Sequence, residues 1–166
     1  MHLSCIVDDL KQARAYATDM LSYADESLWF RQPADGVNHI AWQVGHMTIA
    51  QYVLCLKRIR GVHASDEDLL PVEEYGRLFG KGSVPFPSEH EYPTPVELRT
   101  TFERVHEHVL RELNELPEDE LRKSAGPAHP MFQTKGGSLN FSAKHEMLHV
   151  GQIGLLRRLL GCQFIR

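Results

Sequence analysis

The sequence has few cysteines, no long hydrophobic run and no excess of basic residues. Its three cysteines, Cys5, Cys55 and Cys162, are far apart and form no CxxC pair, so neither a disulfide framework nor a zinc knuckle is indicated. No apolar run approaches the roughly 20 residues of a membrane span, and the first residues lack the basic-then-apolar pattern of a signal peptide. We therefore expect no membrane partner and a cytoplasmic location.

Signals for nucleic acid and for a side-chain nucleophile are also missing. The chain carries 18 Lys and Arg against 22 Asp and Glu, a net charge of −4, whereas phosphate binding requires a basic face. No GxSxG elbow, phosphate-binding glycine loop or cysteine next to a histidine occurs. We expect no nucleic-acid partner, and any chemistry would depend on activation by a bound metal.

What the chain does have is the composition of one ordinary globular domain and an excess of histidine. Its 166 residues, 42% apolar and 24% charged, suffice for a single domain spanning residues 1–166. Ten histidines are the one unusual feature of the composition.

Four segments show the apolar spacing of amphipathic helices. The first covers residues 3–30, with Arg14 as an unexplained polar residue on its apolar face, and it ends at the breaker sequence 32–36. The second covers residues 38–61, with Asn38 as the expected N-cap and Gly61 as the residue after its end.

The third and fourth helices are separated from the others by longer connections. Thr94-Pro-Val-Glu97 is a capping box with proline at the first helical position, and the helix it starts ends before Pro117. Ser138 is the expected cap of the fourth helix, which runs to Gly161. The connections, 62–92 and 118–137, are predicted to be irregular apart from a short helix at 73–79. With no strand-like alternation, the pattern predicts an all-α four-helix bundle with long crossover connections, of which 62–92 would let the two helices it joins run parallel.

Three histidines are candidate metal ligands. His145 and His149 lie one turn apart on one face of the fourth helix, so both imidazoles could reach one ion at about 2.0–2.1 Å. His46 lies beside core residues of the second helix and is the candidate third ligand. Three neutral nitrogens leave positions open for water or substrate, as in catalytic sites. The alternative is that these are half-buried histidines that only form hydrogen bonds.

Neighbouring residues support weaker expectations. Gln152, one turn after His149, could orient a ligand or a bound water, or face solvent. Gly151 and Gly154 indicate close approach of another helix, since glycine weakens a helix. Residues 157–158, both arginine, suit the negative end of the helix dipole and are expected on a solvated face.

The other seven histidines are expected to have no ligand role. His39 lies on the same helical face as His46 and could line a pocket mouth, but a surface position near the helix start is favoured. His106 and His108 are flanked by charged residues and are expected in solvent. The remaining four lie in or beside irregular segments: His2, His63, His90 and His129.

These motifs together carry a family resemblance. The pattern Asn38-x-Ile-Ala-Trp-x-x-Gly-His46, followed far downstream by His145-Glu-x-x-His149-x-Gly-Gln-Ile-x-x-Leu-Arg-Arg-x-x-Gly161, resembles the DinB-like superfamily, which includes the YfiT-like metal-dependent hydrolases. The likeness spans nearly the whole chain. It implies a four-helix bundle, a homodimer, and a divalent metal ion, often nickel or zinc, held by His46, His145 and His149.

The resemblance also implies a type of chemistry. Characterised relatives use low-molecular-weight thiols, as bacillithiol or glutathione S-transferases or as mycothiol-dependent maleylpyruvate isomerase. This implies a metal-dependent enzyme that acts on a small molecule by thiol S-transfer, with the thiol as cosubstrate, or by hydrolysis. His39 and the loops 62–92 and 118–137 depart from the family pattern, and the loops would shape the substrate pocket. The alternative is a non-catalytic metal-binding or stress-response protein of the same fold.

Overall fold

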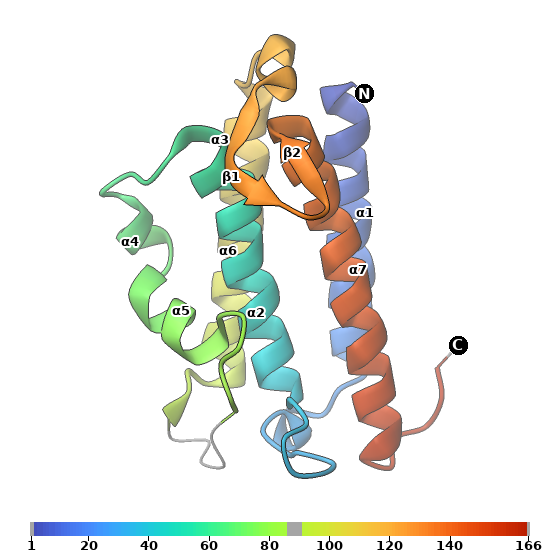
Figure 1. The fold of residues 1–166 in the computed structure, drawn as a ribbon. Helices are drawn as coiled ribbons and strands as arrows, with labels where there is room; N and C mark the ends of the chain where they lie inside the picture. The colour runs from blue at the N-terminus through green and yellow to red at the C-terminus, as the bar shows by residue number, and fades with distance from the viewer. Residues whose placement is uncertain (1, 86–90, 166) are drawn as a thin grey trace.

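The computed structural model describes residues 2–85 and 91–165. Four long helices lie side by side in it: α1 (Leu3–Ser22), α2 (Ile40–Tyr52), α6 (Pro95–Asn114) and α7 (Lys135–Leu159) (Figure 1). Helix α1 packs against α6 and α7, and α2 packs against the same two helices. The predicted all-α four-helix bundle is thereby confirmed. None of the helices in these two ranges combines the length and the apolar character that crossing a membrane requires.

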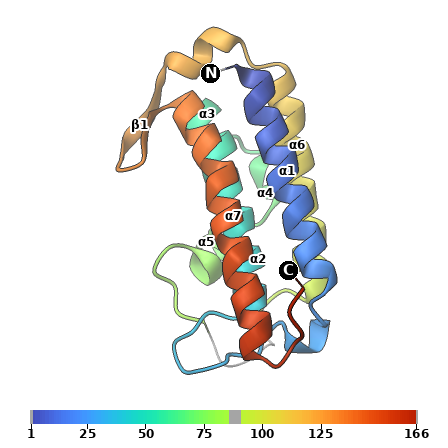
Figure 2. The same cartoon turned by 90° about the vertical axis from the view of Figure 1, so that its right-hand side faces the viewer.

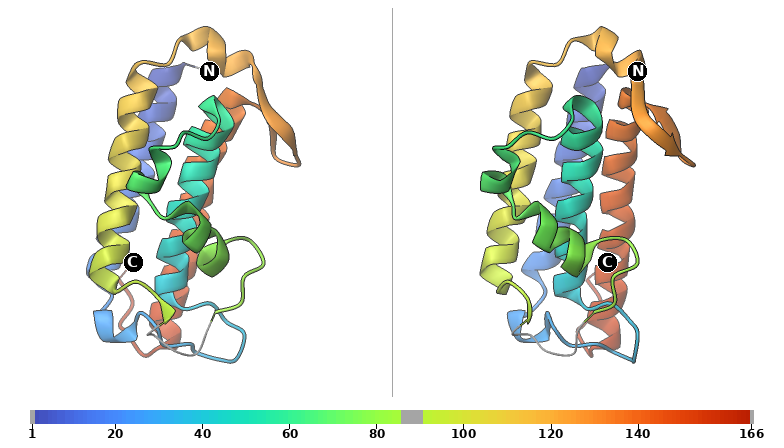
Figure 3. Two further views of the ribbon diagram at one scale, coloured as in Figure 1. Left: turned by 90° about the vertical axis from the view of Figure 1, so that its left-hand side faces the viewer. Right: turned by 60° about the vertical axis from the view of Figure 1, so that its left-hand side comes forward.

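The first long connection lets α2 and α6 run parallel. In Figure 1 the chain descends α1, ascends α2, returns through α4 (Asp66–Leu69) and α5 (Val72–Phe79), and ascends again in α6. Helix α7 then descends beside α1 (Figure 2). Helices α4 and α5 lie outside the bundle, against α6 and α2 respectively (Figure 3). Helix α5 matches the short helix predicted at 73–79, and the first connection is the predicted crossover, whereas the second joins the antiparallel helices α6 and α7.

The second predicted helix is one helical run of three parts. Helix α2 continues through η2 (Val53–Lys57), a turn of π-helix, and α3 (Arg58–Arg60) to Gly61. Gly61 has a φ of 89°, in the left-handed region where glycine is unstrained, so the run ends where the sequence predicts. Single turns of π-helix are frequent at functional sites.

Helix α1 is shorter than predicted. It ends at Ser22, and the next residues form a turn and a short 3₁₀-helix, η1 (Glu26–Leu28). The Asp25 carboxylate accepts hydrogen bonds from the backbone N–H and the hydroxyl of Ser27, at 2.9 and 2.7 Å. Such a side chain satisfies backbone donors outside the helix, which competes with helix continuation despite the apolar spacing.

The cap of α2 is His39 rather than Asn38. His39 Nδ1 accepts from the Trp42 backbone N–H at 3.0 Å. The predicted surface position of His39 is wrong, because the side chain is fully buried between the rings of Phe30 and Tyr92, at centroid distances of 5.5 and 4.9 Å. This burial lowers the pKa of His39 to about 4.

The two later helices begin with threonine caps. The predicted capping box is confirmed: the Thr94 N–H donates to Glu97 Oε2 at 2.8 Å, and the Glu97 N–H donates to Thr94 Oγ1 at 3.3 Å. Helix α7 is capped by Thr134, which accepts from the Gly137 N–H at 3.1 Å. Ser138, the predicted cap, is instead buried inside α7, where its hydroxyl donates to a backbone carbonyl of η2.

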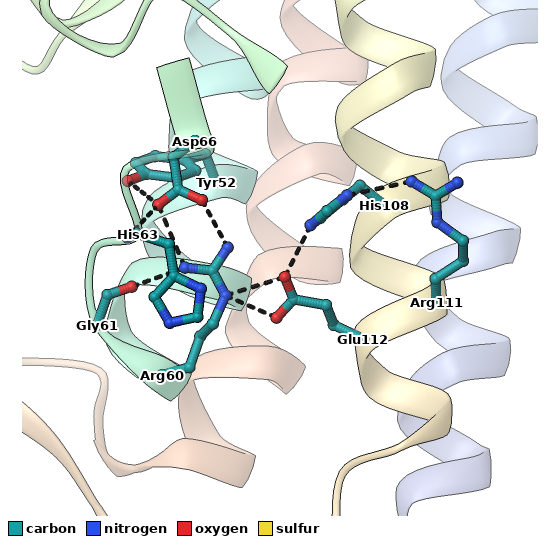
Figure 4. A network of polar contacts seen from close by, with 8 residues as sticks. All are labelled: Tyr52, Arg60, Gly61, His63, Asp66, His108, Arg111 and Glu112. Atoms are coloured by element: carbon teal, nitrogen blue, oxygen red, sulfur yellow. Dashed lines mark hydrogen bonds and ion pairs between the residues drawn. The ribbon is translucent and has the colours of Figure 1, made fainter. Parts of the chain in front are cut away.

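A polar network holds the segment after α3 against α6 (Figure 4). The Arg60 guanidinium lies 2.7 Å from a carboxylate oxygen of both Asp66 and Glu112, and the Tyr52 hydroxyl donates to Asp66 at 2.9 Å. His108, predicted in solvent, is partly buried and lies 2.7 Å from Glu112. Burial alone would raise the pKa of Asp66, but hydrogen bonds from Arg60, a backbone N–H and Tyr52 lower it to about 2.

The second connection contains structure that the sequence pattern does not reveal. The predicted irregular stretch 118–137 includes η4 (Glu118–Arg122) and an antiparallel hairpin of β1 (Ser124–His129) and β2 (Phe132–Thr134). The Arg58 guanidinium donates to two carbonyls of β1, at 3.1 and 3.0 Å, and lies 5.1 Å from the centre of the Phe132 ring. Since these contacts come from a distant helix, local alternation could not indicate the hairpin.

Arg14, the polar residue on the apolar face of the first helix, belongs to a buried network that reaches all four long helices. Its Nε donates to Glu146 of α7 at 2.9 Å, and its Nη2 donates to Gln51 of α2 at 2.9 Å. Its Nη1 donates to the carbonyl of Phe102 in α6. Arg14 and Glu146 are 4% and 3% exposed, so each charge depends on the other inside the core.

Two other residues predicted in solvent are buried. His106 is 6% exposed and lies 3.1 Å from Gln51, so it extends the network around Arg14. Arg157 is 5% exposed and donates to the Tyr23 carbonyl at 2.9 Å, whereas Arg158 is exposed as expected. Charged neighbours in the sequence suggested that both residues lie on a solvated helix face. In the structure both side chains point into the bundle and are buried.

Candidate metal centre

His46 of α2 and the pair His145 and His149 of α7 come together where the two helices pack. One ring nitrogen from each lies within 4.8 Å of the other two. The ring centroids are 4.5 to 5.2 Å apart. His149 is buried, while His46 and His145 are partly exposed. The structure therefore brings together the three side chains that the sequence singles out, and leaves one side of the cluster accessible.

The spacing of the nitrogens suits a small divalent ion. His145 Nε2 and His149 Nε2 lie 3.2 Å apart. Two nitrogens bound tetrahedrally to zinc at about 2.0–2.1 Å would lie roughly 3.3 Å apart. The two nitrogens are therefore already close to the separation that binding of one zinc ion by both would require.

Second partners orient two of the three rings. His46 Nδ1 lies 2.7 Å from the Phe79 carbonyl oxygen, and His149 Nδ1 lies 2.6 Å from Gln43 Oε1. Because both oxygens accept, each Nδ1 carries the ring proton and donates, which leaves the Nε2 lone pair free for a metal. The Trp42 ring stacks on His46 at 4.7 Å and 7°, and this contact further restricts the imidazole.

Burial keeps the three imidazoles uncharged near neutral pH. It lowers the pKa of His149 to about 3, with further lowering by His145 and His46, and it lowers the pKa of His145 to about 4, with contributions from His46 and His129. Burial also lowers the pKa of His46, although the Phe79 hydrogen bond raises it. Neutral imidazole is the form that binds metal, so the protonation state of the three rings is compatible with metal binding.

Gln43 is the orienting residue that sequence reasoning missed. It is 3% exposed in the structure, and its only signal in the sequence was an amide one turn before His46. Gln152, the residue predicted for this role, is exposed and contributes a hydrogen bond that raises the pKa of His149. The two amides thus contact the same ring from α2 and from α7.

Glu146 does not take part in the cluster. The string His145-Glu-Met-Leu-His149 matches the H-E-x-x-H pattern, in which the glutamate acts as general base beside zinc. Here the Glu146 carboxylate is buried against Arg14, with its two oxygens 2.9 and 3.3 Å from guanidinium nitrogens. The zinc-protease arrangement is therefore not present.

A cavity of about 510 Å³ borders His46 and His145. Its wall is largely apolar and comes from the second helical run, the hairpin turn and α7: Ile49, Ala50, Val53, Leu54, Pro130 and Phe141. Gly80 and Lys81 of the first connection and His129 of the second complete the lining. A larger cavity of about 680 Å³, beside the start of α7, is lined by none of the three clustered histidines. Ligand sites commonly have 300–1,000 Å³, so the cavity at the cluster suits a small molecule.

The remaining histidines are not members of the three-histidine cluster. His2 and His63 are exposed, His129 is at the cavity, and His90 lies outside the described residues.

Comparison with protein families agrees with the motifs. The model of the DinB superfamily matches residues 9–153, which contain all three clustered histidines. A search of curated proteins found no match.

Proposed function

The chain belongs to the DinB superfamily, and on that premise we propose that it is a metal-dependent enzyme that transfers a low-molecular-weight thiol to a small electrophile. His46, His145 and His149 would hold a divalent ion. The observation that carries the proposal is that Gln43 and the Phe79 carbonyl accept from Nδ1 of two neutral imidazoles and thereby direct their Nε2 lone pairs toward the cluster, next to a cavity of about 510 Å³.

Imidazole ligands suit nickel and zinc, the two ions that the resemblance implies. A divalent ion bound by three neutral ligands keeps its full charge, and it lowers the pKa of a coordinated water toward about 7 or deprotonates a coordinated thiol. The chain's own residues supply the geometry: Gln43 and Trp42 hold the rings, and the apolar wall of the cavity limits water around the reacting atoms.

Thiol transfer is favoured over hydrolysis because the described residues place no carboxylate base at the cavity. No carboxylate lines the cavity among residues 2–85 and 91–165, and Glu146 is held by Arg14 inside the core. A free thiol has a pKa of about 8.5, far below that of water, so it needs less help from a side-chain base to lose its proton.

The first measurement is the metal content of untagged protein loaded with nickel or zinc. We expect one equivalent per chain in the native protein, and loss of most of it in His46→Ala, His145→Ala and His149→Ala. His63→Ala is the matched control, because His63 is exposed and outside the cluster. Unchanged metal content in all three variants would contradict the site.

The second measurement is turnover by the metal-loaded protein. We expect conjugation of monochlorobimane with glutathione or another small thiol, lost in the three histidine variants. Hydrolysis of nitrophenyl acetate without conjugation would instead indicate a hydrolase. Silence in both assays would favour a non-catalytic metal-binding or stress-response protein.

Three further features remain part of the proposal. Residues 1–166 would form a single domain, and the protein would be a cytoplasmic homodimer. The dimer and the thiol cosubstrate rest on the family resemblance, and the location on the sequence alone.

A further inference from the structure

The cavity beside the histidine cluster has an apolar wall and a cationic rim. Val53 and Leu54 of η2 and Phe141 of α7 contribute to the wall. Lys81, on the turn after α5, is the one permanently charged side chain that lines the cavity within residues 2–85 and 91–165. A substrate would therefore meet an apolar surface and a single positive charge.

No carboxylate neutralises Lys81 in the described part of the chain. The ion pairs there involve other residues, and the Lys81 side chain is exposed at the rim. Three neutral imidazoles would also leave the charge of a bound ion uncompensated. As far as the described residues define it, the rim is therefore electropositive in a chain whose net charge is −4.

His129 adds a hydrogen-bond donor to the same rim. Its Nδ1 accepts from the Met131 backbone N–H at 3.2 Å, so the proton of the neutral ring is on Nε2. The ring stacks on Phe132 at 4.1 Å and 19° and lies 5.3 Å from Phe141, which holds it on the hairpin. Partial burial, Arg58 and Lys81 lower the pKa of His129, so the ring is present as the neutral donor.

We infer that the electrophilic substrate carries a carboxylate, which Lys81 and His129 bind at the rim while its apolar body lies along the wall formed by Val53, Leu54 and Phe141. The reactive atom then faces the three clustered histidines. That the bound acid is a substrate rests on the proposed function. Selective binding of an acid by Lys81 and His129 does not, because it requires no turnover.

The test compares two ligands of the same shape that differ in charge. Binding of phenylbutyrate and of its neutral amide, phenylbutyramide, is measured by isothermal titration calorimetry on native protein, with and without zinc. We expect the acid to bind more tightly than the amide by roughly tenfold, the difference that one charge-assisted contact supplies.

Variants assign that preference to the rim. Lys81→Met keeps the length of the side chain and removes its charge, so it should abolish most of the preference without changing binding of the amide. His129→Phe keeps the aromatic stacking and should reduce the preference less. Lys57→Met is the matched control, since Lys57 is exposed and does not line the cavity.

Two results would overturn the inference. One is equal binding of acid and amide by the native protein. The other is a preference that survives Lys81→Met but disappears without zinc, which would place the carboxylate at the ion. Because binding to metal-free protein needs neither ion nor turnover, failure of the proposed enzyme activity would be seen separately.

Discussion

The two ring nitrogens of His149 have different surroundings. Nδ1 donates to Gln43 at 2.6 Å, and Nε2 lies 3.2 Å from His145 Nε2. The amide oxygen thus selects the tautomer and the direction of the lone pair. A histidine pair at helical spacing is common in proteins, and here a buried amide fixes one ring of the pair in the orientation that the proposed metal binding requires.

At this scale we predict that Gln43→Leu lowers zinc affinity by roughly 10–100-fold, the usual effect of losing such an orienting partner. The buried Nδ1–H of His149 loses its acceptor, and the ring can rotate. Affinity is measured by competition with a chromophoric chelator.

Gln12→Leu is the control, because Gln12 is exposed on α1. Native zinc affinity in a folded Gln43→Leu protein would show that the amide does not orient the ring.

Helices α2 and α5 approach each other closely at Gly45. A Cβ on Gly45 would lie 2.4 Å from Phe79 Cγ, which is closer than two carbon atoms can pack. The carbonyl of the same Phe79 accepts from His46. The contact between these two elements therefore positions one of the three clustered histidines.

We predict that Gly45→Ala destabilises the fold by about 1–3 kcal/mol, as overpacked core positions do, and also weakens zinc binding. Denaturant unfolding and chelator competition give the two values. Stability equal to that of the native protein would contradict the close approach.

Gly151→Ala is the matched control on α7. Close approach of another helix was expected at Gly151 and Gly154, but an added Cβ at Gly151 meets nothing within 4 Å, and at Gly154 it makes only ordinary contact with Met20 at 3.8 Å. The expectation is wrong for Gly151. Replacing it should stabilise the helix by up to about 1 kcal/mol.

Among residues 2–85 and 91–165, six histidines are buried or partly buried with lowered pKa values. They lie at the start of α2, on α2, α6 and α7, and at the end of β1: His39, His46, His106, His129, His145 and His149. Burial is the first cause in each. Proton uptake is therefore disfavoured in the folded protein at sites on α2, α6, α7 and the hairpin.

This predicts that the metal-free protein loses stability as the pH falls below about 6.5, the value for an unperturbed histidine. The folded pKa values lie below the unfolded ones, so the unfolded state binds more protons, and the contribution is complete above that pH and declines below it. Each site adds up to about 1.4 kcal/mol per pH unit. Urea unfolding between about pH 7.5 and 4.5 measures the slope before most carboxylates titrate.

His39→Asn is the control, since asparagine is a good N-cap and does not titrate. Its stability should fall less steeply with acid than that of the native protein. A stability that is constant, or rises, over this pH range would contradict the prediction.

Much of the fold could be predicted from local chemistry. Apolar spacing marks the four helices because each must bury one face, and the Thr94 capping box acts entirely within its own helix turn. The long connection through α4 and α5 allows α2 and α6 to run parallel. The spacing of His145 and His149 places both on one face whatever surrounds the helix.

Only the tertiary structure decided which polar groups meet. In the sequence, Arg14 is a polar residue on an apolar helix face and Glu146 belongs to the histidine motif. In the structure they form a buried ion pair because α1 packs on α7. Gln43 and the Phe79 carbonyl become ring partners, and Arg58 supports the hairpin, through contacts between distant segments. Local periodicity determines which face of a helix is apolar; the rotation and pairing of helices, set by packing of the whole core, determine what each polar side chain contacts.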